Sequence, residues 1–148
     1  MAAALDSKER SRVPLLEGLL SHPLGDLGSV RLMGTKCSHC GEVALGTKAV
    51  CPNCGTTAVK PLPLSDRGVL WSFTVARHRP PGDYRGAEPF SPFGLGLIEL
   101  PDGVRVYSPI DGPIDALKIG MELRFKAFLR HDEEHDVVTF AFEAVGHP

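Results

Sequence analysis

Two short stretches decide how this chain folds: Cys37-Ser-His-Cys40-Gly41 and Cys51-Pro-Asn-Cys54-Gly55. In each stretch two residues separate the cysteines, so a tight turn can aim both sulfur atoms at one ion. The glycine that follows supplies the positive φ that such a turn commonly adopts. Together the two turns predict a closed shell of four thiolates, which is a structural metal site with no open position for a substrate.

Other uses of the four cysteines are less compatible with the pattern. A reducing cytosol disfavours disulfides, and a thioredoxin-like pair would occur once, at the junction of a strand and a helix. Zinc is favoured over iron, although an iron of the rubredoxin kind satisfies the same spacing. His39 could replace a sulfur, but with four thiolates available we interpret it as an exposed spacer. The predicted ligands are Cys37, Cys40, Cys51 and Cys54.

The composition limits what surrounds this site. A chain of 148 residues with 43% apolar and 23% charged residues fits one ordinary core plus a small appendage held by a metal. The net charge of -2 gives no basic excess for nucleic acid. No apolar run is long enough to span a membrane, and the first ten residues lack the order of a secretory signal. We therefore expect a cytoplasmic protein that binds neither nucleic acid nor a membrane.

Before the cysteines, residues 14–20 predict a short helix. Pro14 suits a helix start, and the leucines that follow make one apolar stripe about two turns long. The stripe could pack on its own domain or dock a partner. We assign residues 1–30 to an N-terminal helical segment and residues 31–60 to a zinc ribbon.

After the cysteines, the pair Pro61 and Pro63 marks a predicted domain junction, and residues 61–148 show the period-two alternation of β-strands. A helical turn that begins at Pro113 and closes at Gly120 stands between the third and fourth strands. Five strands in this order predict an OB-type β-barrel, since a two-sheet sandwich would need about seven strands. The expected strands cover residues 69–77, 93–100, 104–110, 122–130 and 137–145.

The segment between the first two barrel strands is long and has no periodicity, which is typical of a functional or mobile loop. It mixes arginines with aromatic side chains, the composition of a docking surface or of a rim that touches anions. Candidate contacts with a partner or with coenzyme A (CoA) are Arg77, Arg79, Tyr84, Arg85 and Phe90.

Three stretches in order resemble a known family: Leu32-Met-Gly-Thr-Lys-Cys37 leading into the two turns, Leu64 to Val75, and Lys118 to Phe125. The family is that of OB-fold proteins with an N-terminal rubredoxin-like zinc ribbon. The resemblance covers roughly residues 30 to 145, and the first thirty residues match poorly. It implies a non-catalytic subunit that forms a hetero-oligomer with a thiolase-like enzyme and holds a CoA thioester jointly with it. Within the family, the chain is similar to small subunits of degradative thiolases that act on aromatic or steroid-type compounds, such as (hydroxybenzyl)succinyl-CoA thiolase.

The residues agree with a helper role, because thiolytic cleavage needs a free cysteine thiolate and all four cysteines are assigned to the metal. The string His131-Asp-Glu-Glu134-His135 matches a metalloprotease motif, but that motif requires a helix and here falls in a predicted hairpin loop. The alternative function is binding of single-stranded nucleic acid, with Trp71, Phe93 and Tyr107 as stacking platforms. The predicted hairpin loop at residues 131–136 is acidic, whereas a groove for nucleic acid needs Lys or Arg, so this alternative is disfavoured.

Overall fold

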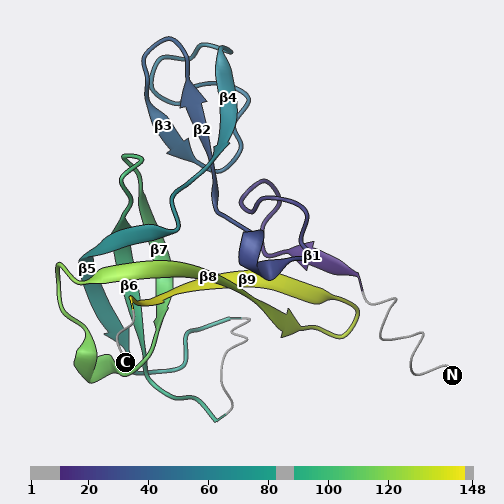
Figure 1. Ribbon diagram of the computed structural model, residues 1–148. Coiled ribbons are helices and arrows are strands. Elements are labelled where there is room, and N and C mark those ends of the chain that lie inside the picture. Colours follow the sequence, from purple (N-terminus) through teal and green to yellow (C-terminus); the bar gives the residue numbers. More distant parts are fainter. Residues whose placement is uncertain (1–10, 83–88, 146–148) are drawn as a thin grey trace, which may run out of the picture. The chain divides into compact units, whose positions relative to one another are not determined.

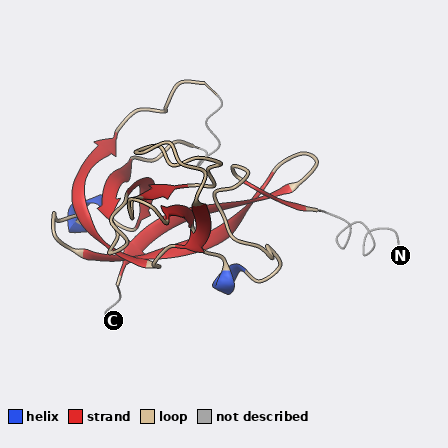
Figure 2. Cartoon of the chain, turned by 90° about the horizontal axis from the view of Figure 1, so that it is seen from above, coloured by secondary structure: helices blue, strands red, loops and turns tan. Residues whose placement is uncertain are grey.

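The computed structural model describes residues 11–82 and 89–145. Strands dominate this part of the chain, and its helices are two single turns of 3-10 helix, η1 (Leu27–Ser29) and η2 (Ile114–Ala116) (Figure 2). None of the described helices has the length and apolarity to cross a membrane. The chain divides into two compact units. One contains residues 11–65 and 126–140, and the other contains residues 66–125 with the segment from Ala141 onward.

The five barrel strands follow the predicted order, and the second unit contains the first three of them with the start of the fourth and the end of the fifth. The Pro101-Asp-Gly103 hairpin is confirmed: Gly103 has a φ of 95° and its N–H donates to the carbonyl of Leu100. The predicted helical turn is confirmed as η2, with Pro113 at its N-cap and Gly120 at a φ of 93°. The strands are β5 (Arg67–Ala76), β6 (Phe93–Glu99), β7 (Arg105–Asp111), β8 (Glu122–His131) and β9 (Asp136–Ala144).

These strands close on themselves, as the OB-type prediction requires. Their order is β9-β7-β6-β5-β8, and a further pairing of β8 with β9 completes the ring (Figure 1). The closure depends on two short ladders, the antiparallel pairs Arg67 to Val69 of β5 with β8 and the parallel pairs Ile110 and Asp111 of β7 with β9. Full closure leaves few unpaired strand edges, which suits a small all-β unit.

The barrel interior is filled by alternate side chains of its strands. Gly96 of β6 makes room for them, because a Cβ there would lie 2.6 Å from Ile110 Cδ1 and 2.8 Å from Leu70 Cδ1. Such distances show that larger neighbours occupy the space that the glycine leaves. The buried residues include Leu70, Ile98, Val106, Leu123 and Phe142.

The first unit contains the ribbon, a three-stranded antiparallel sheet in the order β3-β2-β4. It consists of β2 (Met33–Cys37), β3 (Val43–Leu45) and β4 (Val59–Pro63). Pro61 and Pro63, predicted to mark a domain junction, lie within β4, an edge strand where a residue without an N–H is tolerated. The domain boundaries themselves stay predictions.

The predicted helix over residues 14–20 is wrong. Pro14 ends a strand, β1 (Arg12–Pro14), which pairs in parallel with β9. The N–H of Leu15 then donates to Val138 at 2.8 Å, and Gly18 turns the chain at a φ of 82°. A helix of two turns is marginal by itself, so hydrogen bonds to an existing strand prevail over it. The leucine stripe is divided accordingly: Leu20 is buried, whereas Leu15 and Leu16 are exposed.

Candidate metal centre

The two cysteine turns have the same local geometry. The N–H of Cys37, the last residue of β2, donates to Glu42, and the N–H of Cys51 donates to Thr56 in the equivalent place. Gly41 and Gly55 have φ values of 78° and 79°, which confirms the positive φ expected of the residue after each pair. Each turn therefore presents its two sulfurs on one side, as the spacing predicts.

The four sulfur atoms converge. All lie within 4.8 Å of one another, and the pairs Cys37 with Cys54 and Cys40 with Cys51 are each 3.6 Å apart. Sulfurs bound to one tetrahedral zinc at about 2.3 Å would be about 3.8 Å apart. The donor set and its dimensions fit a structural zinc held by four thiolates, with no position left for water or substrate.

Backbone N–H groups support negative charge on the sulfurs. Those of His39 and Cys40 point to Cys37 Sγ at 3.3 Å, and those of Asn53 and Cys54 point to Cys51 Sγ at 3.3 Å and 3.4 Å. The N–H of Cys40 is the main reason that the pKa of Cys37 is lowered. Hydrogen bonds to the ionised form favour it, so the first turn favours the thiolate of Cys37 before any metal arrives.

Asn53 stabilises one thiolate of this centre, a role that the sequence did not indicate. Its side-chain amide donates to Cys40 Sγ at 3.5 Å and is the first cause that lowers the pKa of Cys40 to about 6. The only available signal was its place as a spacer within the second turn. Although the N–H of Thr56 favours the thiolate of Cys54, desolvation and the neighbouring sulfurs raise the pKa of Cys54 to about 12. A full set of four thiolates therefore needs a cation, and protons compete with the metal as the pH falls.

The other metal-binding candidates occupy positions of a different kind. His39 is exposed, and its backbone N–H points to Cys37 Sγ. The string from His131 to His135 lies in the hairpin between β8 and β9, where His131 Nδ1 is 2.8 Å from an Asp136 carboxylate oxygen. The hairpin prediction is thus confirmed. Across residues 11–82 and 89–145, the four cysteines are the one group of three or more His, Cys, Asp or Glu whose ligand atoms converge.

Three of the five predicted contact residues of the long loop lie among the described residues. Arg77 and Arg79 are exposed, and the Phe90 ring meets the Phe93 ring edge to face at 6.2 Å. Tyr84 and Arg85 lie outside the described residues. Their roles stay predictions.

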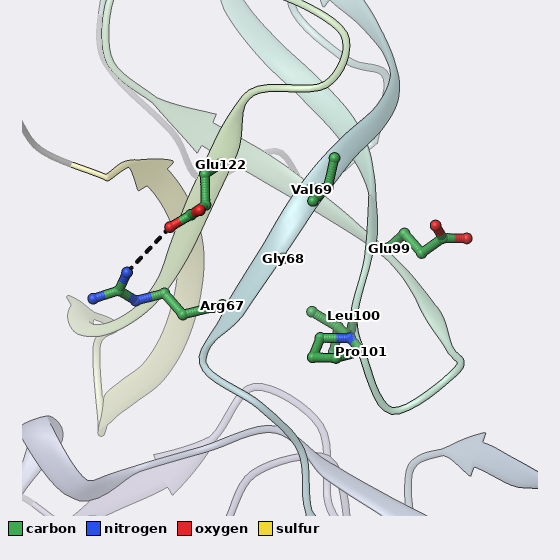
Figure 3. A pocket seen from close by; sticks show the side chains of 7 residues that line it. All are labelled: Arg67, Gly68, Val69, Glu99, Leu100, Pro101 and Glu122. Carbon is green, nitrogen blue, oxygen red and sulfur yellow. Dashed lines mark hydrogen bonds and ion pairs between the residues drawn. The ribbon is translucent and has the colours of Figure 1, made fainter.

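The barrel has an open pocket of its own, of about 330 Å³ (Figure 3). Figure 3 shows the strand of Gly68 and Val69 running between an ion pair, Arg67 with Glu122 at 3.4 Å, and the corner at Leu100 and Pro101. Sequence patterns gave no sign of this pocket, because its walls come from β5, β8 and the end of β6. Its lining is Arg67, Gly68, Val69, Glu99, Leu100, Pro101 and Glu122.

Comparison with known proteins matches both parts of the chain. Residues 28–60 match the model of the ChsH2 rubredoxin-like zinc ribbon domain, and residues 62–128 match that of the ChsH2 C-terminal OB-fold domain. A DUF35 domain-containing scaffold protein of Methanocaldococcus jannaschii is 30% identical over 116 residues, which cover 76% of this chain and 79% of that protein.

Two further proteins that are similar to this chain have names that include an enzyme. The benzoylsuccinyl-CoA thiolase subunit BbsA of Geobacter metallireducens is 24% identical over 123 residues, covering 81% of this chain and 79% of that subunit. The solved structure of an Ltp2-ChsH2(DUF35) aldolase covers 78% of this chain and 86% of the matched chain, with a TM-score of 0.63 and 24% identity. At that identity the solved structure supports the fold.

Proposed function

Because the chain belongs to the family of DUF35 scaffold proteins, in which a ChsH2-type zinc ribbon precedes an OB-fold domain, we propose that it is the non-catalytic subunit of a thiolase-like complex. The complex would cleave or form carbon–carbon bonds in acyl-CoA thioesters. The names of the relatives, scaffold protein and thiolase subunit, support this assignment.

The observation that carries the proposal is the convergence of every cysteine of the chain on one site. A thiolase needs an activated cysteine thiolate that accepts the acyl group and a base for the carbanion. Four thiolates that share one zinc are closed to substrate. The nucleophile must then come from another chain, while zinc would fix the ribbon and take no part in the reaction.

We further propose that the acyl group belongs to an aromatic or steroid-type compound under degradation. The name of the BbsA relatives, benzoylsuccinyl-CoA thiolase subunit, supports the aromatic branch. Thiols held by a metal are suited to a reducing compartment, in line with the cytoplasmic location that we propose.

The first test is co-expression with a thiolase-like chain of the same organism. We expect the two chains to copurify, and we expect benzoylsuccinyl-CoA cleavage, followed as CoA-dependent loss of thioester, to need both. The zinc-loaded chain alone should show no turnover. Turnover by the purified chain alone, together with a thiol that remains titratable while zinc is bound, would refute the proposal.

We also propose that the long loop between β5 and β6 helps to hold the CoA part of the substrate at the joint surface, with Tyr84, Arg85 and Phe90 as contacts of the same loop. Exposed Arg77 and Arg79 carry the guanidinium forks that bind phosphate well. Arg77→Gln with Arg79→Gln should weaken CoA binding to the assembled complex about tenfold, or ~1.4 kcal/mol. Isothermal titration would measure it, with Lys118→Gln, an exposed cation elsewhere on the barrel, as the control. An unchanged affinity would reject the loop assignment.

A further inference from the structure

The outer surface of the barrel strands carries side chains in cross-strand rows. In one row, Val69 of β5 stands between Glu122 of β8 and Glu99 of β6, and Glu99 pairs with Arg105 of β7. In the next row, Leu97 of β6 pairs with Tyr107 of β7, and Trp71 occupies the bulge of β5 between Leu70 and Ser72. We call Val69, Trp71, Leu97, Arg105 and Tyr107 the Trp71 face.

The apolar members of the Trp71 face lie open to solvent. Val69 is 44% exposed, Trp71 47% and Tyr107 63%, whereas Leu97 is half-buried. Single exposed apolar residues are ordinary, but here two aromatic rings and a valine share one side of three adjacent strands. Tryptophan, tyrosine and arginine are the residues most enriched where binding energy concentrates in protein interfaces.

Arg105 contacts both an aromatic ring and a carboxylate on this face. Its guanidinium lies 4.0 Å from the centre of the Trp71 ring and 3.1 Å from a Glu99 carboxylate oxygen. The guanidinium thus reaches from β7 across β6 to β5 and stacks over the indole, a contact that limits the rotamers open to Trp71. A side chain that is already ordered loses less entropy when a partner binds, so the face is prepared for contact.

Charged side chains on and near the Trp71 face form ion pairs. Arg105 pairs with Glu99, Arg67 with Glu122 at 3.4 Å, and Arg124 with Glu143 at 2.9 Å. In each of these pairs a glutamate offsets the arginine, which disfavours binding of a phosphate backbone, because single-stranded nucleic acid binds to a surface of uncompensated positive charge. An apolar centre with a neutral polar rim instead complements an uncharged, partly apolar patch on a folded protein.

We propose that the Trp71 face is the surface on which the catalytic thiolase-like subunit docks. This inference rests on the proposed function, and it names the contact surface that the proposed function leaves open. The pocket beside Val69 borders the same face and would take an apolar side chain of that subunit between Val69, Leu100 and Pro101 (Figure 3). The contact would remove both aromatic rings from water and leave the ion pairs at the rim.

The test measures binding of the purified thiolase-like chain of the same organism to the zinc-loaded wild type and to variants. Trp71→Ala with Tyr107→Ala should weaken binding at least about 100-fold, because central aromatic side chains supply much of the binding energy of an interface. Tyr107→Asp alone, which places a charge in the centre of the face, should weaken it at least about tenfold. Ile119→Ala removes another exposed apolar side chain of the same unit, 69% exposed, and should leave the affinity within about twofold.

The possible results separate this inference from the proposed function. If the wild type binds the thiolase-like chain and Tyr107→Asp binds it equally well, the Trp71 face is not the docking surface while the proposed function stands. If the wild type does not bind it at all, the proposed function fails as well. Two other results would overturn the inference: self-association of the wild type that Tyr107→Asp abolishes, and binding of a single-stranded oligonucleotide that Trp71→Ala abolishes.

Discussion

Removal of the metal with a chelator is expected to unfold the ribbon, residues 32–60, while the barrel strands β5 to β7 remain folded. The reason lies in the ribbon sheet itself. Strands β3 and β4 contain no buried residue, and the buried residues of β2 are Gly34, Thr35 and Cys37. Apolar burial this small cannot offset the entropy of ordering the segment, so metal binding supplies its folding free energy, about 10 kcal/mol or more.

Amide hydrogen exchange measures this result directly. After chelation the N–H groups that pair β2 with β3 and β4 should exchange like those of an unfolded chain, and added zinc should restore their protection. Cys40→Ser should reproduce the loss, whereas His39→Ala, which changes an exposed spacer in the same turn, should keep one zinc per chain. Lowering the pH should release zinc, because protons compete for the thiolates and the pKa of Cys54 is raised to about 12. Protection of the β2 amides that survives complete metal removal would contradict the prediction.

Phe142→Ala is expected to destabilise the barrel by about 3–5 kcal/mol, the usual cost of deleting a fully buried aromatic ring. Phe142 has no exposed surface, and its ring meets the Phe125 ring edge to face at 5.8 Å. It also stands at the parallel pairing with Ile110, where β9 meets β7 to close the barrel. The substitution therefore leaves a cavity and weakens one of the two short ladders on which closure depends.

Urea unfolding followed by the fluorescence of Trp71, the single tryptophan, would measure this cost. Phe142→Leu keeps most of the volume and should cost clearly less. Phe128→Ala removes a ring that is 40% exposed and should change the unfolding free energy by less than about 1 kcal/mol. Equal effects of Phe142→Ala and Phe128→Ala would show that the barrel is not stabilised around Phe142.

Several features followed from short stretches of sequence, and each depends on neighbours in the chain. The cysteine spacing and the glycines after each pair predicted convergence of the sulfurs, because a tight turn of fixed length determines where both sulfurs point. The hairpin at Gly103 and the turn at Pro113 followed from the φ values that these residues favour. Period-two alternation placed the barrel strands to within a few residues of their observed bounds.

Other features depended on contacts between distant segments. The alternation in β5 indicated a strand, but only closure of the barrel decided that Leu70 faces inward and that Val69 and Trp71 face solvent. The leucines from Leu15 to Leu20 suit a helix locally, yet pairing of β1 with β9, more than a hundred residues further along the chain, made the start of that segment extended.

The sequence by itself thus determined the convergence of the four cysteines, the order of the strands and the absence of a fifth thiol, since these depend on residue type and short spacing. Tertiary structure alone decided which side of each strand is buried, that Arg105 stacks on Trp71, and which apolar side chains remain on the surface. The physical reason is that burial depends on what packs against a residue. For β5 the neighbouring strands are β6 and β8, which no local pattern specifies.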